Sequence, residues 1–133
     1  MRHRVYGKHL GRTKNERASL FKNLIGSLIL HGSIQTTEAK SKAIKALTDK
    51  IINQAKGKNT KRLVEQFLTQ RSIEEKLLQE VVPGLSGRNS GYTSIIKLGP
   101  RLGDGAMMVR MSLLMEEPKQ EKKASKKKEV KTI

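Results

Sequence analysis

The first long amphipathic segment of the chain lies between Thr13 and Gly32. Apolar side chains recur there every three or four residues, as on one side of a helix. The middle of this side is formed by Leu20, Leu24 and Leu28, and its flanks by Phe21, Ile25 and Ile29. The sequence "TKNE" places Thr13 and Glu16 at the spacing of a capping box, and Gly32 can end a helix in a left-handed conformation. The pattern therefore predicts a helix between Thr13 and Gly32.

A short strand and a second amphipathic helix are predicted next. The segment "SIQTT" (33–37) is rich in β-branched residues, and Thr37 can cap a helix that starts at Glu38 and ends at Gly57. The apolar positions of this helix are Ile44, Leu47, Ile51 and Ala55, and its lysines at other positions are Lys40, Lys42, Lys45 and Lys50. These lysines fit a solvated face and a contact surface equally well.

Two further helical segments follow the second helix. Asn59 can cap a short third helix, whose apolar side is formed by Leu63, Val64, Phe67 and Leu68. The sequence "SIEE" (72–75) is a second capping box, and it predicts a fourth helix that ends at Pro83 and Gly84.

The pattern becomes extended after the glycine-rich loop 84–91. The segments "YTSIIKL" and "MMVRMSLL" flank "GPRLGDGA", which predicts a β-hairpin. One face of the second strand is apolar, with Met107, Val109, Met111, Leu113 and Met115, whereas Arg110 and Ser112 lie on the other. The apolar face must pack on the helices, so we expect an α+β fold: a two-layer α/β body in the order α-β-α-α-α-β-β.

Both ends of the chain differ from this body. Residues 1–12 combine cations with Gly7 and Gly11 and lack an apolar period, which predicts a mobile basic arm that gains order from a partner. From Glu116 the chain reads "EEPKQEKKASKKKEVKTI", with seven Lys, four Glu and few apolar residues, which predicts a disordered tail over 116–133. Residues 13–115 then form a single domain.

The charge of the chain points to an anionic partner. Its 28 Lys and Arg against 12 Asp and Glu give a formal net charge of +16, and self-repulsion of this size favours a polyanion as ligand. Arginines in the arm can form paired hydrogen bonds to phosphate, and the glycines beside them allow close backbone approach. Only two Tyr and two Phe are present, so phosphate and shape contacts should dominate over the stacking of several bases.

The sequence gives little support to other classes of chemistry. The chain has no Cys, and its three His residues have no acidic cluster nearby, so we expect no metal site and a reducing compartment. "GPRLGDGA" fits a hairpin turn better than a nucleotide-binding loop. No nucleophile, base and orienting group stand together, so we expect neither an enzyme nor a cofactor nor a small-molecule substrate.

Membrane insertion and export are also disfavoured. The longest apolar stretch, "LIGSLIL", is far shorter than the roughly 20 residues of a membrane span, and the first residues lack the apolar core of a signal peptide. An Arg-rich transit peptide is an alternative interpretation of the arm, which Glu16 and the capping box disfavour.

Several segments together resemble one family. "MRHRxxGxxLGR", the helix after it, "IxTTEAKxK", "GRNSGYTSIIKLGPRLGDGA" and the closing apolar strand are similar to the bacterial large-subunit ribosomal protein seventeen family over roughly residues 1–115. The resemblance implies a cytoplasmic structural protein of the large ribosomal subunit that binds large-subunit ribosomal RNA. It also implies a place near the nascent-chain exit, among neighbouring ribosomal proteins. The tail after Met115 is not part of the family pattern.

The resemblance also implies which residues face the RNA. They are Arg2, His3, Arg4, Lys8, His9, Arg12, Lys14, Arg17, Lys22, Arg88, Lys97 and Arg101. From the residues alone, Arg88 and Arg101 either contact different phosphates or keep their loops soluble. A DNA-binding architectural protein is the main alternative, although the sequence shows no clear recognition helix and no apolar wedge. A chaperone-like or regulatory partner protein is a third possibility.

Overall fold

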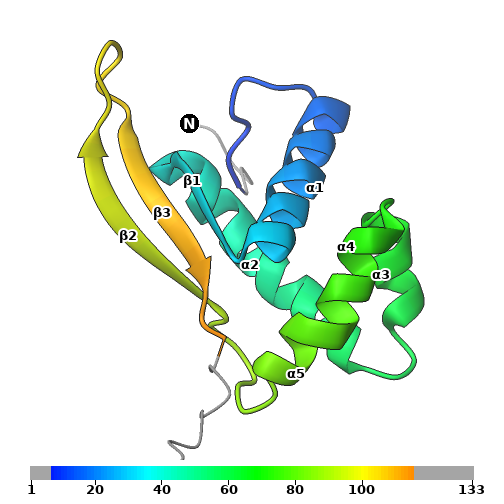
Figure 1. Cartoon of the computed structure of the whole chain (residues 1–133). Coiled ribbons are helices and arrows are strands. Elements are labelled where there is room, and N and C mark those ends of the chain that lie inside the picture. The colour runs from blue at the N-terminus through cyan, green and yellow to red at the C-terminus, as the bar shows by residue number, and fades with distance from the viewer. Residues whose placement is uncertain (1–6, 116–133) are drawn as a thin grey trace, which may run out of the picture.

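In the computed structural model, which describes residues 7–115, helices cover one face of a small antiparallel sheet (Figure 1). The elements are α1 (Lys14–His31), β1 (Ser33–Thr37), α2 (Glu38–Lys56), α3 (Lys61–Phe67), α4 (Arg71–Lys76), the π-helical turn η1 (Leu77–Val81), α5 (Val82–Gly84), β2 (Thr93–Pro100) and β3 (Met107–Leu113). Since α4, η1 and α5 follow one another without a break, they form the predicted fourth helical segment. The predicted α+β class and element order are confirmed.

The sheet has the strand order β1-β3-β2, with both neighbours antiparallel to β3. Val109, Met111 and Leu113 of β3 are buried under the helices, as the alternation predicted. Arg110 lies on the open face, where it pairs with Gln35 of β1 and Ile96 of β2. A charge is tolerated in this central strand because the face that carries it is not covered.

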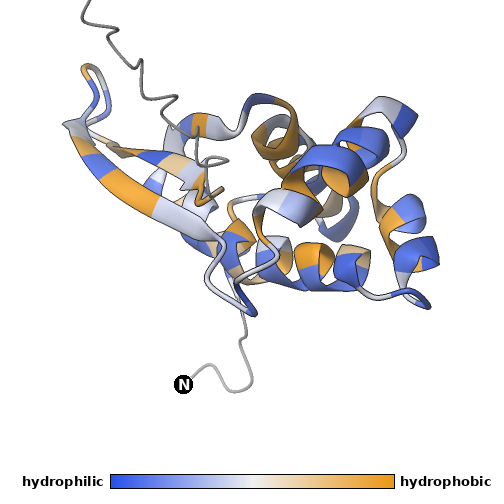
Figure 2. Ribbon diagram, turned by 60° about the horizontal axis from the view of Figure 1, so that its bottom comes forward, coloured by the Kyte–Doolittle hydropathy of each residue, from blue (hydrophilic) through white to orange (hydrophobic). Residues whose placement is uncertain are grey.

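Helix α2 lies at the centre of the fold and contacts all three strands. Its residues Ile44, Ile51 and Ile52 are almost completely buried, and Leu47 is half-buried. The buried hydroxyl of Thr48 donates to the Ile44 carbonyl at 2.9 Å, so this polar group has a partner in the core. Figure 2 shows hydrophilic and hydrophobic residues alternating along the helices, and hydrophobic residues also along the hairpin strands.

Both ends of helix α1 lie where the sequence predicted them, but its buried face is rotated relative to the predicted apolar side. The Glu16 carboxylate accepts hydrogen bonds from the Thr13 backbone N–H and hydroxyl at 2.9 and 2.8 Å, and Gly32 is left-handed with φ of 71°. Leu24, predicted at the middle of the apolar side, is only half-buried. The fully buried positions are Ile25, Gly26, Leu28 and Ile29.

Two predicted details of the later helices are wrong. Thr60, not Asn59, is the N-cap of α3, and its hydroxyl donates to the Gln54 carbonyl at the end of α2 at 2.5 Å. Ser72 lies inside α4, whose N-cap is Gln70, so "SIEE" is not a capping box. The predicted end of the fourth segment at Pro83 and Gly84 is confirmed, because α5 ends at Gly84, and Pro83 lies in its first turn, where the missing N–H is tolerated.

Parts of the predicted arm and tail lie outside the described residues. These are residues 1–6 of the arm and the whole of the predicted tail, 116–133. The division into an arm, a body and a tail therefore stays a prediction. Between residues 7 and 115, no helix is both long and apolar enough to cross a membrane.

Candidate nucleic-acid interface

The described part of the arm, residues 7–12, folds back on the start of α1. The Arg12 backbone N–H donates to the His9 carbonyl at 3.2 Å, and Leu10 and Gly11 have positive φ angles of 55° and 62°. The Arg17 guanidinium lies 3.0 Å from His9 Nδ1, and it also donates to the carbonyls of His9 and Arg12 at 3.4 and 3.3 Å. Arg17, a predicted RNA contact, thus positions the arm.

A hollow of about 440 Å³ lies between the arm, α1 and α2. Lys8, His9, Arg17 and Lys42 contribute its polar and cationic lining, and Phe21 contributes to its apolar lining. The structure thus brings together three predicted RNA contacts, Lys8, His9 and Arg17. It also places Lys42 beside them, a residue for which the sequence fitted a solvated face and a contact surface equally well. Such a convergence of positive charge raises the local concentration of anionic groups.

Lys97 joins this region through a shared carboxylate. Glu38 Oε1 lies 2.6 Å from Lys42 Nζ and 3.6 Å from Lys97 Nζ. The hydrogen bond from Lys42, supported by the charge of Lys97, holds the pKa of Glu38 below its ordinary value. One carboxylate therefore orders two ammonium groups and leaves one positive charge in excess.

The loop that carries Arg88 is fixed by a lysine of α2. Lys56 Nζ donates to the carbonyls of Leu85, at 2.7 Å, and of Arg88, and to the Tyr92 hydroxyl at 3.0 Å. The same ammonium lies 4.5 Å from the centre of the Tyr92 ring, which is completely buried. These contacts hold the backbone of the loop while the Arg88 residue is exposed.

The buried tyrosine ties this loop to α2 at two more points. The Tyr92 hydroxyl donates to Asn53 Oδ1, and the Tyr92 backbone N–H donates to Asp49 Oδ1 at 3.2 Å. Asp49, Asn53 and Lys56 follow one another along α2 at spacings of four and three residues. One side of a single helix therefore determines where the Arg88 loop lies.

Replacing Lys56 with Met is expected to lower the free energy of unfolding by about 1–3 kcal/mol, because carbonyls that now accept from an ammonium lose their donor. Affinity for large-subunit ribosomal RNA should fall as well, since the Arg88 loop loses its fixed position. Lys58→Met, an exposed site two residues away, is the matched control. Urea unfolding and RNA binding measure both effects, and equal behaviour of the two variants would refute the positioning role.

Arg101 lies in the turn of the hairpin, which extends beyond the helical layer (Figure 1). Its guanidinium forms two parallel hydrogen bonds to Asp104, at 2.7 and 2.6 Å. These bonds are the main reason that the pKa of Asp104 lies well below its ordinary range, and a hydrogen bond from the Ala106 backbone N–H lowers it further. The interpretation of "GPRLGDGA" as a hairpin turn is confirmed, and Leu102 within it is fully exposed.

The predicted contact residues do not form one site. Arg88 and Arg101 lie beyond opposite ends of the eight-residue strand β2, roughly 25 Å in length, so one phosphate cannot bind both. Lys14 is exposed at the start of α1, and the Lys22 ammonium lies 5.8 Å from the ring centre of Phe67, the last residue of α3. Arg2, His3 and Arg4 lie outside the described residues. The described cations thus form a dispersed surface suited to an extended polyanion.

Comparison with known proteins places this cationic α+β body in a family. The sequence model of the family described as Ribosomal protein L17 matches residues 20–114. The chain belongs to the ribosomal protein L17 family. This match runs from within α1 to the end of β3, so the family pattern covers the whole sheet and all of the helical layer except the first turns of α1.

Relatives within the L17 family match over nearly their full lengths. The protein of Thermodesulfovibrio yellowstonii is 39% identical over 94% of this chain and 100% of its own length. Those of Carboxydothermus hydrogenoformans and Rubrobacter xylanophilus are each 42% identical, over 83% and 86% of this chain and 100% and 96% of their own lengths. All three are named large ribosomal subunit protein bL17.

Proposed function

We propose that this protein is a structural constituent of the large ribosomal subunit and binds large-subunit ribosomal RNA mainly through phosphate and shape contacts. The observation that carries the proposal is the similarity to proteins named large ribosomal subunit protein bL17, two of which match over their entire lengths. Membership of the L17 family also supports the predicted non-enzymatic role, the cytoplasmic location in the subunit and the association with neighbouring ribosomal proteins.

The geometry of the described residues fits binding to a folded RNA. The hollow beside the arm, the Arg88 loop and the hairpin turn present cations at three separated places. A folded RNA offers phosphates in several directions at fixed spacings, so contacts of this kind recognise its shape. We assign phosphate contacts to the exposed Lys8, Arg12, Arg88 and Arg101, and a positioning role to Arg17.

The alternative of a DNA-binding architectural protein gains no support. Among the helices of residues 7–115, the longest, α2, packs on all three strands and is therefore not available as a recognition helix in a major groove. The names of the relatives also assign them to the ribosome.

Co-sedimentation with ribosomal subunits tests the proposal. Labelled protein is added to large subunits that lack their own L17 protein, and the mixture is centrifuged through sucrose in high salt. We expect the label to pellet with large subunits in a one-to-one ratio, and not with small subunits handled in parallel. Equal pelleting with both subunits, or complete release at the salt concentration of the wash, would contradict a structural role.

A further inference from the structure

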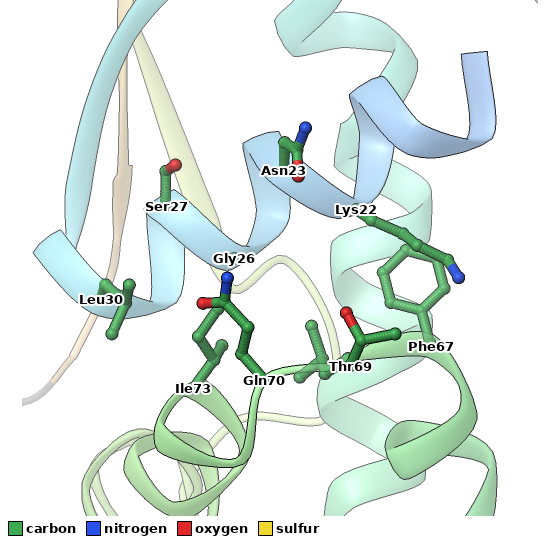
Figure 3. A pocket seen from close by; sticks show the side chains of 10 residues that line it. Lys22, Asn23, Gly26, Ser27, Leu30, Phe67, Thr69, Gln70 and Ile73 are labelled. Atoms are coloured by element: carbon green, nitrogen blue, oxygen red, sulfur yellow. The ribbon is translucent and has the colours of Figure 1, made fainter. Parts of the chain in front are cut away.

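A second pocket, of about 200 Å³, lies between α1 and the loop that joins α3 to α4 (Figure 3). Lys22 and Gly26 of α1 line one side, and Phe67, Thr69 and Gln70 line the other. None of these residues lines the hollow beside the arm, so this pocket is a separate feature of the surface.

The close approach of the two helical segments shapes this pocket. A Cβ atom on Gly26 would lie only 3.0 Å from Cδ1 of Ile73, a residue of α4 that also lines the pocket. Because Gly26 has no side chain, α1 comes close to α4 while the space beside it stays open. The pocket is thus formed by the folded body and does not depend on the arm.

The groups around the pocket suit a planar, polar and anionic ligand. Phe67 is half-buried, and the Lys22 side chain runs past its ring, with the ammonium 5.8 Å from the ring centre (Figure 3). Thr69 and Gln70 are exposed, and in Figure 3 the Gln70 amide extends toward Gly26. Together they offer an aromatic surface, a cation and groups that both donate and accept hydrogen bonds.

We propose that this pocket takes one unstacked nucleobase of the bound RNA, an inference that rests on the proposed function. The pocket is smaller than the roughly 300 Å³ at which sites for drug-sized ligands begin, which favours a single base. Phe67 supplies the surface for stacking, the Gln70 amide binds the edge of the base, and Lys22 neutralises the adjoining phosphate. A single base is consistent with the small number of aromatic residues in the chain.

Chemical probing of large-subunit ribosomal RNA with the intact protein tests this inference. The variants are Phe67→Leu, which removes the ring but keeps an apolar side chain, and Gln70→Ala at an exposed position. Gln66→Ala, exposed on α3 and outside the pocket, is the control. Reagents that modify the Watson–Crick edges of the four bases report on the base, and hydroxyl radicals report on the backbone footprint.

We expect the wild-type and Gln66→Ala proteins to protect at least one unpaired base, and the two pocket variants to lose that protection within an unchanged backbone footprint. Affinity should fall roughly 5- to 150-fold for Phe67→Leu, the range expected for the loss of a base-stacking aromatic ring. Gln70→Ala carries the test if Phe67→Leu proves unstable. Identical base protection by all four proteins would overturn the inference of a nucleobase pocket but not the proposed function. A wild-type protein without any backbone footprint would overturn the proposed function as well.

Discussion

Deletion of residues 1–12 is expected to reduce the slope of log affinity against log salt by roughly three to four units, because Arg2, Arg4, Lys8 and Arg12 are lost together. Affinity for a fragment of large-subunit ribosomal RNA should fall most at low salt. Between about 50 and 200 mM salt, the advantage of the intact protein should shrink roughly 100-fold. Thr13 and Glu16, whose hydrogen bonds cap α1, remain in the shortened protein.

The matched control for this deletion keeps the length of the arm. Replacing the same four cations with Gln should reproduce most of the change in slope, because the effect arises from charge. Circular dichroism confirms that both variants stay folded. Equal slopes for the intact and shortened proteins would show that the arm contributes no phosphate contacts, and would leave the Arg88 and Arg101 loops as the binding surface.

Replacement of Ile51 with Ala is expected to lower the free energy of unfolding by about 2–5 kcal/mol, because it leaves a cavity at the centre of the core. Ile51 lies on α2, the helix that contacts all three strands, and only 1% of its surface is exposed. Lys50→Ala, one position away and exposed, is the control. Urea unfolding of the two variants measures the difference, and similar midpoints would show that the buried face of α2 is wrongly assigned.

The helices and strands that are specified by their own caps, turn residues and apolar periodicity could be predicted from the sequence. The second helix was predicted between Thr37 and Gly57 and spans Glu38–Lys56. The hairpin strands were equally clear, because alternation along β3 separates buried Val109 and Met111 from exposed Arg110. Here the caps, the turn residues and the apolar period all indicated the same structure.

The buried face of α1 could not be predicted because a distant residue determines it. Gly26 has no side chain to mark it as apolar, yet it is buried where Ile73 of α4 packs against α1. This contact shifts the centre of the face from Leu24 toward Ile25 and Ile29.

The candidate interface was predicted as a set of cations, but their arrangement was not. Arg88 was chosen for its charge and its glycine-containing loop. Lys56, which fixes that loop, lies 29 to 36 residues before its three partners, so no local pattern shows the connection. The link between Lys97 and Lys42 likewise depends on the packing of the hairpin over the start of α2, where both contact Glu38.

The central claim is that this protein recognises the folded large-subunit ribosomal RNA and not merely a high density of phosphate. A competition experiment tests it most directly, with labelled ribosomal RNA and unlabelled duplex DNA of equal phosphate content, near physiological salt. The account predicts that most of the protein stays on the ribosomal RNA when the two are equal in phosphate. A distribution between RNA and DNA in simple proportion to phosphate would contradict it.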